Sequence, residues 1–278
     1  MKYVSLFSPG LDSFLSDWVM SDVREKNDST YIRCYFNINV SYSESEIKHL
    51  KRNWCENEII FISNLDLAKV EEKDFHVPQR NLLFCVLAQS LFNPDKIILS
   101  GVLDDRVSDN DNDFRILTTR ILSKTSEKTI DVISPLGFNE KSKWVKSWYL
   151  ENKNNKLDII TKTFSCFNPL YIEKNINIYR VEQDYIHEVN IRVETNTHKE
   201  FEKETSLSHV GCLSCTACFR RICALTAANI YLPFYNIEIL RKYKSQIEEM
   251  SHRLPNRATS IQNYIYFYEK VLNGGKEI

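Results

Sequence analysis

The first half of the chain alternates short apolar runs, rich in β-branched residues, with segments of helical periodicity. Strands are expected over 3–7, 31–40, 58–63, 96–102 and 130–136, and helices over 12–23, 44–54, 79–92, 114–124 and 141–153. Apolar strands separated by helices are typical of βαβ units, in which helices cover both faces of a parallel sheet. Because such crossovers are right-handed, the pattern predicts an α/β fold with a doubly wound, mostly parallel sheet.

The pattern changes after residue 165, so we expect an α/β domain over 1–165 and a second region over 166–278. Within that region, 171–210 contains short alternating stretches such as Val189–Val193, which suit exposed antiparallel strands. We interpret 171–210 as an insertion. Helices are expected over 220–232 and 261–275, the second of them ended by two glycines.

The bulk composition excludes several classes of protein. With 278 residues, of which 43% are hydrophobic and 26% charged, the chain can bury a full core. A net charge of −1 argues against an extended surface that coats nucleic acid, although a local basic groove stays open. No apolar run approaches the ~20 residues that cross a bilayer, and the first residues lead into a strand rather than a signal peptide. We therefore expect a cytoplasmic protein with no membrane partner.

A polar turn, Ser8-Pro9-Gly10-Leu11-Asp12-Ser13, joins the first expected strand to the first expected helix. In open α/β sheets, ligands bind beyond the carboxyl ends of strands, where backbone N–H groups and the positive helix end stabilise an anion. Glycine allows close approach to phosphate, the two serines add hydroxyl donors, and Asp12 suits such a site if Mg²⁺ lies between it and the phosphates. The turn is neither a Walker loop nor a dinucleotide-binding glycine loop. An N-capped helix start is the simpler alternative.

The same six residues resemble the PP-loop, Ser-Gly-Gly-x-Asp-Ser, of ATP pyrophosphatases, which adenylate a substrate oxygen and release pyrophosphate. Pro9 departs from that pattern, because proline has no N–H and removes one potential donor to phosphate. The loss of one charge-assisted hydrogen bond costs roughly 1.5–3 kcal/mol, which would weaken ATP binding without abolishing it. The alternative is that the Pro9 nitrogen points away from the phosphate.

Three of the eight cysteines, Cys212, Cys215 and Cys218, follow the spacing Cys-x2-Cys-x2-Cys. Thiolates spaced in this way can surround one metal ion, and a closed tetrahedral zinc site is the usual outcome. Such a site needs a fourth ligand. The candidates for that ligand are Cys166, Cys223 and His209.

An ordered set of motifs resembles the QueC family, the 7-cyano-7-deazaguanine synthases, from residue 3 to about residue 225. After the PP-loop come Val77-Pro78-Gln79-Arg80-Asn81, a strand ending in Gly101-Val102, Pro135-Leu136 with Lys141, then Cys166, and finally the clustered cysteines with Arg220. The resemblance implies an adenine nucleotide alpha hydrolase-like fold and a zinc-bound helical C-terminal part. By that resemblance the zinc ligands are Cys166, Cys212, Cys215 and Cys218. We interpret the remaining cysteines, Cys34, Cys55, Cys85 and Cys223, as structural thiols.

Members of that family make a nitrile from 7-carboxy-7-deazaguanine, ammonia and ATP, a step of queuosine biosynthesis. The resemblance implies that the substrate carboxylate attacks the α-phosphorus of ATP, that pyrophosphate leaves, and that ammonia captures the acyl adenylate. A second ATP then activates the amide for dehydration. By the same resemblance, the residues that bind pyrophosphate and Mg²⁺ are Ser8, Gly10, Leu11, Asp12 and Ser13. Lys141 would neutralise charge on the phosphates. Arg80, Asn81 and Gly101 would lie beside the nucleotide and substrate.

Each of the three side chains outside the PP-loop also has a simpler interpretation. Arg80 could be a solvated residue at a helix start, Lys141 could be a surface lysine, and Asn81 could cap its helix.

Two segments that contact the substrate in the family are changed in this chain. "YFNINVSYSESE" stands in place of Tyr-Gly-Gln-x-His, and "DDRVSDNDNDFR" lacks the tyrosine, proline and cysteine of Tyr-Pro-Asp-Cys-Arg. The acidic residues of the second segment, Asp104, Asp105, Asp109 and Asp111, could accept hydrogen bonds from a guanine-like edge, hold a metal or form a solvated loop. Because a site built to hydrogen-bond one substrate discriminates strongly, the loss of both segments indicates a changed acceptor.

We therefore expect a zinc-containing, ATP-dependent ligase that acts on 7-carboxy-7-deazaguanine or on a diverged acceptor. A carboxylate on another protein would suit a phage or antiphage system, with 171–210 as a docking segment in a homodimer or hetero-complex. Two alternatives stay open. One is a PP-loop tRNA-thiolation enzyme, whose cysteines bind an iron–sulfur cluster. The other is a non-catalytic nucleotide-binding partner subunit, which Pro9 and the two changed segments favour.

Overall fold

The computed structural model describes residues 1–26, 28–72, 75–103, 109–152, 158–167, 170–171, 174–182, 185–193, 209–210, 215–232, 244–245, 247, 252 and 255–272. The chain divides into two compact units, Met1–Phe167 and Asn168–Ile278. Within the described ranges, every helix falls short of the length or the apolar character that a bilayer crossing requires.

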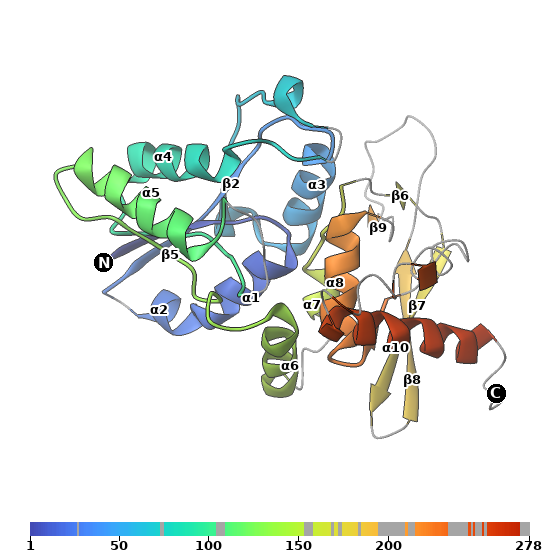
Figure 1. Cartoon of the computed structure of the whole chain (residues 1–278). Helices are drawn as coiled ribbons and strands as arrows, with labels where there is room; N and C mark the ends of the chain where they lie inside the picture. The colour runs from blue at the N-terminus through green and yellow to red at the C-terminus, as the bar shows by residue number, and fades with distance from the viewer. Residues whose placement is uncertain are drawn as a thin grey trace. The chain divides into compact units, whose positions relative to one another are not determined.

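The first unit is an α/β fold built on a five-stranded parallel sheet (Figure 1). Its strands are β1 (Lys2–Leu6), β2 (Thr30–Phe36), β3 (Ile59–Ile62), β4 (Lys96–Ile98) and β5 (Asp131–Ile133). Its helices are α1 (Leu11–Val19), α2 (Ser21–Glu25), α3 (Ser43–Asn53), α4 (Arg80–Phe92), α5 (Asn112–Lys124), α6 (Lys141–Glu151) and α7 (Asp158–Thr161), with 3-10 turns η1 (Glu56–Glu58) and η2 (Ala68–Val70). The predicted α/β class and parallel sheet are confirmed.

The strands of this sheet follow the order β3-β2-β1-β4-β5, and every neighbouring pair is parallel. The chain builds outward from β1 through β2 to β3 and then crosses to β4, on the other side of β1. The topological switch point therefore lies between β1 and β4. Ligands of open α/β sheets bind at the carboxyl ends of the strands that flank such a point.

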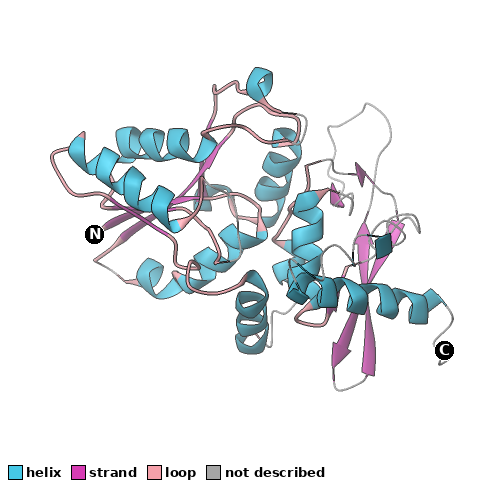
Figure 2. Ribbon diagram, viewed as in Figure 1, coloured by secondary structure: helices cyan, strands magenta, loops and turns pink. Residues whose placement is uncertain are grey.

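Successive residues of β2 pack against different groups of helices. Cys34 belongs to one core cluster with Cys85 of α4 and Leu122 of α5. Its neighbour Tyr35 belongs to another cluster with Leu50 of α3. Figures 1 and 2 show α4 and α5 on one side of the sheet and α1 and α2 on the other. Helices thus cover both faces, as a doubly wound sheet requires.

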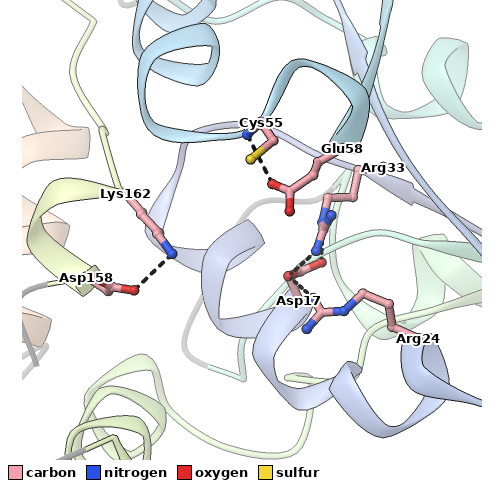
Figure 3. A network of polar contacts seen from close by, with 7 residues as sticks. All are labelled: Asp17, Arg24, Arg33, Cys55, Glu58, Asp158 and Lys162. Atoms are coloured by element: carbon pink, nitrogen blue, oxygen red, sulfur yellow. Dashed lines mark hydrogen bonds and ion pairs between the residues drawn. The ribbon is translucent and has the colours of Figure 1, made fainter. Parts of the chain in front are cut away.

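A buried ion pair holds α1 on this sheet (Figure 3). Arg33 of β2 donates from Nε to Asp17 Oδ1 at 2.7 Å and from Nη2 to Asp17 Oδ2 at 3.0 Å. Arg24 donates to the same carboxylate at 2.7 Å. Asp17 and Arg33 are only 5% and 8% exposed. Residues 7–10, called the turn 7–10 below, connect β1 to α1. Because α1 directly follows this turn, the ion pair helps to position it.

The second unit contains short antiparallel strands and helices. Strands β7 (Lys174–Glu182) and β8 (Tyr185–Val193) pair antiparallel, and β10 (Ile230–Tyr231) pairs antiparallel with β7. Strand β6 (Leu170–Tyr171) pairs antiparallel with β9 (His209–Val210). The described helices are α8 (Thr216–Thr226) and α10 (Pro255–Leu272). The antiparallel strands predicted within 171–210 are confirmed.

The helix expected over 220–232 is wrong in its second half. Helix α8 ends at Thr226, and Ile230 and Tyr231 form β10 instead. Asn229 has a left-handed conformation with φ 58°, which a continuous helix does not allow. The apolar run that follows suits either a helix or a strand, and pairing with β7 decides in favour of the strand.

Cys55 is exposed, but it keeps a structural role as the N-cap of η1, because it forms a capping box with Glu58. Helix α3 ends at Asn53, and Trp54 then turns inward to pack edge-on against Phe7, with ring centroids 4.8 Å apart. The next residue, Cys55, is exposed and directly precedes η1. Cys34, Cys85 and Cys223 are buried, as expected.

Candidate functional site

The turn between β1 and α1 places hydroxyl groups against its own backbone amides. Ser8 N–H donates to Ser13 Oγ and Gly10 N–H donates to Ser8 Oγ, both at 3.2 Å. Leu11 N–H donates to Ser165 Oγ at 3.3 Å. These hydrogen bonds are longer than the usual N–H···O distance, and an anionic oxygen is a stronger acceptor than a hydroxyl. The three amides can therefore exchange their hydroxyl partners for an anion.

Pro9 leaves the donors on either side of it in place. Its carbonyl accepts a hydrogen bond from Phe164 N–H at 2.6 Å, which ties the turn to the segment before Cys166. Gly10 has φ −61° and ψ 151°, an extended conformation that any residue adopts. A Cβ at this position would lie 3.1 Å from Ser8 Oγ, so glycine provides space here rather than conformational freedom.

Two charged residues far apart in the sequence meet beside this turn. Lys141 Nζ lies 2.9 Å from Asp12 Oδ2, and the two side chains are 10% and 24% exposed. Asp12 lies in the first turn of α1, and Lys141 is the first residue of α6. The two helices pack through Phe14 and Trp148, whose ring centroids are 5.3 Å apart. The alternative of a surface lysine at 141 is therefore wrong.

Arg80 and Asn81 begin α4, after Gln79 in a left-handed conformation with φ 59°. Arg80 Nη1 donates to Tyr42 Oη at 2.7 Å. Asn81 Nδ2 donates to the carbonyl of Asp109 at 3.1 Å. Both side chains contact loops at the carboxyl edge of the sheet. The alternative of a helix-capping Asn81 is wrong, because Gln79 is the N-cap, and Arg80 is only partly exposed.

Gly101 lies in the loop after β4, on the other side of the switch point from the turn 7–10. Its N–H donates to Ser134 Oγ at 3.1 Å, and the same hydroxyl donates to the Gly101 carbonyl. A Cβ on Gly101 would lie 2.7 Å from Asn110 Oδ1. The absence of a side chain thus lets three segments of chain approach one another.

The acidic segment after this glycine is described only in part. Asp111 accepts a hydrogen bond from Phe114 N–H at 2.7 Å and so caps α5. Asp109 offers its backbone carbonyl to Asn81. Asp104 and Asp105 lie outside the described residues.

A carboxyl group that the sequence analysis did not single out lies close to Arg80. Tyr35 Oη donates to Glu46 Oε2 at 2.8 Å. Burial raises the pKa of Glu46 to about 7, although the Tyr35 hydroxyl and the Arg80 charge act in the opposite direction. Burial likewise raises the pKa of Tyr42 to about 12, against the charge of Arg80. The signal in the sequence is spacing, because Glu46 precedes the buried Leu50 by one helical repeat and so lies on the same face of α3.

Replacing Glu46 with glutamine should stabilise the protein in alkaline but not in acidic solution. The pKa of the folded state, about 7, exceeds the ordinary value of 4.5, so stability is greatest below pH 4.5 and is lost as the pH rises through 7. Because the side chain is only partly buried, we expect Glu46→Gln to add about 2 kcal/mol of unfolding free energy at pH 8 and much less at pH 5. Thermal melting at both values measures this difference.

The matched control is Glu44→Gln, in the same helical turn as Glu46. Glu44 is exposed and forms an i, i+4 ion pair with Lys48. Its replacement should change stability by less than about 0.5 kcal/mol at either pH. A Glu46→Gln effect of equal size at pH 5 and pH 8 would contradict the elevated pKa.

Three cysteine sulfurs lie close together. The Sγ atoms of Cys166, Cys215 and Cys218 are within 4.8 Å of one another. Cys215 caps α8, because its Sγ accepts a hydrogen bond from Cys218 N–H at 3.5 Å. The pairing of Leu170 with Val210 brings together the two ends of the segment that we interpret as an insertion.

This donor set is compatible with zinc. With Zn–S bonds of 2.3 Å, the sulfurs of a tetrahedral site are about 3.8 Å apart, so the three thiols need only a small adjustment to surround one ion. The expected ligand Cys212 lies outside the described residues. Of the other candidates for a fourth ligand, Cys223 is buried within α8 and His209 pairs with Tyr171 in the β6–β9 ladder.

No protein-family model matches this chain, and no curated protein matches it. Among solved structures, the chain is similar to a crystal structure described as a predicted subunit of tRNA methyltransferase from Methanocaldococcus jannaschii. The identity is 15%, the TM-score is 0.34, and the match covers 72% of this chain and 100% of that one. A likeness with this TM-score carries no inference about function.

Proposed function

We propose that this protein is a QueC-like, ATP-dependent ligase that activates a carboxylate by adenylation and releases pyrophosphate. The observation that carries the proposal is the place of the turn 7–10 at the carboxyl end of β1, beside the β1–β4 switch point. A triphosphate there would meet the amides of that turn and the N-terminus of α1. The strand order and this turn also favour the adenine nucleotide alpha hydrolase-like fold family.

The Asp12–Lys141 pair supports the choice of ATP as substrate. Mg²⁺ prefers carboxylate and phosphate oxygens, and Asp12 would hold it beside the phosphates, where the ion would neutralise negative charge. Lys141 would then turn from Asp12 to the phosphate oxygens. The proposed reaction requires no nucleophilic side chain, because positioning and charge neutralisation supply most of the catalysis in phosphoryl and adenylyl transfer.

The proposed reaction starts with the substrate carboxylate. Its oxygen forms a bond to the α-phosphorus of ATP, while the bond from that phosphorus to the oxygen bridging to the β-phosphorus breaks, so pyrophosphate leaves. Ammonia then attacks the acyl carbon, AMP leaves with the former carboxylate oxygen, and a proton passes to solvent. Arg80, the Tyr42 hydroxyl and the Glu46 carboxyl form a cluster of polar groups, which suits a polar heterocycle that carries a carboxylate.

A pyrophosphate-release assay with ATP, ammonia and 7-carboxy-7-deazaguanine tests the proposal. We expect release that requires the carboxylate, with a protein-borne carboxylate as the second acceptor to assay because the two substrate segments are changed. Tight ATP binding without release for any carboxylate would contradict catalysis and favour the non-catalytic partner subunit.

Metal analysis separates the proposed zinc site from the iron–sulfur cluster of a tRNA-thiolation enzyme. We expect a colourless protein with about one zinc ion per chain, because three converging thiols form most of a closed zinc site. Cys215→Ser should lose most of the zinc, whereas Cys55→Ser, at the exposed cysteine before η1, should keep it. A brown protein that contains iron and sulfide would contradict the zinc assignment.

A further inference from the structure

A pocket of about 510 Å³ lies between α5 and β5, the strand at one edge of the sheet. Figure 1 shows these two elements side by side. It is lined by Arg115, Ile116 and Arg120 of α5, by Val132 of β5, and by Gly137 and Phe138 of the following turn. No residue of the turn 7–10 lines this pocket, although Ser134, which does line it, hydrogen-bonds to Gly101. Its size is that of a pocket for a small ligand.

The edge of the sheet beside this pocket is closed to strand addition. Thr119 Oγ1 accepts a hydrogen bond from Val132 N–H at 2.8 Å, and Ser123 Oγ accepts one from Ile130 N–H at 2.9 Å. Both hydroxyls come from one face of α5, one turn apart. They satisfy backbone donors that would otherwise attract another strand. A ligand of this pocket must therefore be recognised by side chains rather than by extension of the sheet.

Arg115 presents a partly buried cation to the pocket. Its Nη1 donates to the carbonyl of Asn110 at 2.7 Å, which fixes the guanidinium. A Cβ on Gly137 would lie 3.1 Å from Nη2, so the glycine leaves room for this group. Burial lowers the pKa of Arg115, and the charge of Asp111 opposes this only in part. Among the described residues, the hydrogen bond of this guanidinium uses Nη1, so Nε and Nη2 are left as donors for an anion.

Arg120 and two exposed apolar side chains, Phe138 and Ile116, indicate what else the ligand contains. Arg120 lies further along the pocket side of α5 and is exposed. Neither arginine forms an ion pair with a carboxylate in the part of the chain that the structure describes. Phe138 is 65% exposed at the rim, and Ile116 is 42% exposed. A planar or apolar group would cover these side chains while an anionic group meets the arginines.

We propose that this pocket binds a small organic phosphate with an aromatic group, such as a nucleoside monophosphate. Arg115 and Arg120 bind the phosphate, since guanidinium groups match phosphate oxygens with paired hydrogen bonds. The aromatic part lies against Phe138 and Ile116. This site does not depend on the proposed ligase reaction.

Calorimetric titration of the full chain with AMP tests the proposal. A saturating non-hydrolysable ATP analogue is present throughout, so that the turn 7–10 does not contribute to AMP binding. We expect one AMP site per chain, with adenosine and inorganic phosphate each binding at least about tenfold more weakly than AMP. Arg120→Ala should weaken AMP binding by about tenfold or more. The matched control is Lys124→Ala, in the last turn of α5 but outside the pocket lining, which should leave it unchanged.

Several outcomes would overturn this site. They are undetectable AMP binding, adenosine binding as strong as that of AMP, or an Arg120→Ala variant that melts like the wild type and still binds AMP normally. Because Arg120 is exposed, its replacement is not expected to prevent folding. AMP binding that follows these expectations in a protein without pyrophosphate release would contradict the ligase proposal and leave the pocket assignment standing.

Discussion

Asp12→Asn should lower the rate of pyrophosphate release by about 10²–10³-fold, the usual effect of removing one electrostatic group from the reacting centre. The wild-type carboxylate lies 2.9 Å from Lys141 Nζ, in the first turn of the helix that follows the turn 7–10. Asparagine keeps the shape of the side chain but removes the charge that would hold Mg²⁺ and orient Lys141. The rate is measured under saturating ATP and acceptor.

Asp22→Asn provides the matched control for this substitution. Asp22 lies in the first turn of α2 and is exposed. Its replacement should leave the rate within about twofold, because surface substitutions away from a site have small effects. A melting curve shows whether Asp12→Asn folds, given that it leaves Lys141 without its carboxylate. A folded Asp12→Asn protein that retains more than about a third of the wild-type rate would contradict the role of Asp12.

The parallel sheet could be predicted from the sequence because each strand is a short, continuous apolar run that is visible locally. Runs such as Ile97 and Ile98 in β4 are apolar on both faces, which only a sheet covered on both sides explains. The end of α8 could not be predicted in the same way. Ile230 and Tyr231 suit a helix locally, and their partners in β7 lie about fifty residues earlier in the chain. Such a distant pairing leaves no local pattern.

In the candidate site, too, residues in a local motif could be predicted, and residues placed by tertiary packing could not. The turn 7–10 and Lys141 could be predicted because they lie in motifs that resemble those of a known family, and the structure brings Asp12 and Lys141 together. No motif marks Glu46, and its burial depends on how α3 packs against the strand that carries Tyr35. The pocket beside α5 is a property of tertiary packing, because Arg115 and Phe138 come from different elements and neither is unusual in its own segment.

Asp17→Ala is expected to lower the free energy of unfolding by about 3–5 kcal/mol, the usual cost of leaving a buried charge without its partner. Arg33 is 8% exposed and donates two hydrogen bonds to Asp17 (Figure 3). Its guanidinium also lies 5.2 Å from the ring centroid of Trp54. Burial alone would lower the pKa of Arg33, but the hydrogen bonds and charge of Asp17 raise it above its usual value. Without Asp17, the guanidinium stays charged in a site that is largely buried.

Two further variants distinguish this mechanism from a simple loss of packing. Arg24→Ala removes the arm of the network that is 34% exposed and should cost no more than about 1 kcal/mol. The double variant Asp17→Leu with Arg33→Met removes both charges, so it should be more stable than Asp17→Ala alone, since no unpaired charge is left in the core. Urea denaturation of the wild type, these variants and the single variants Asp17→Leu and Arg33→Met measures these differences. A double variant as unstable as the sum of its single changes would mean that shape at this position, rather than charge pairing, holds α1 and the turn before it on the sheet.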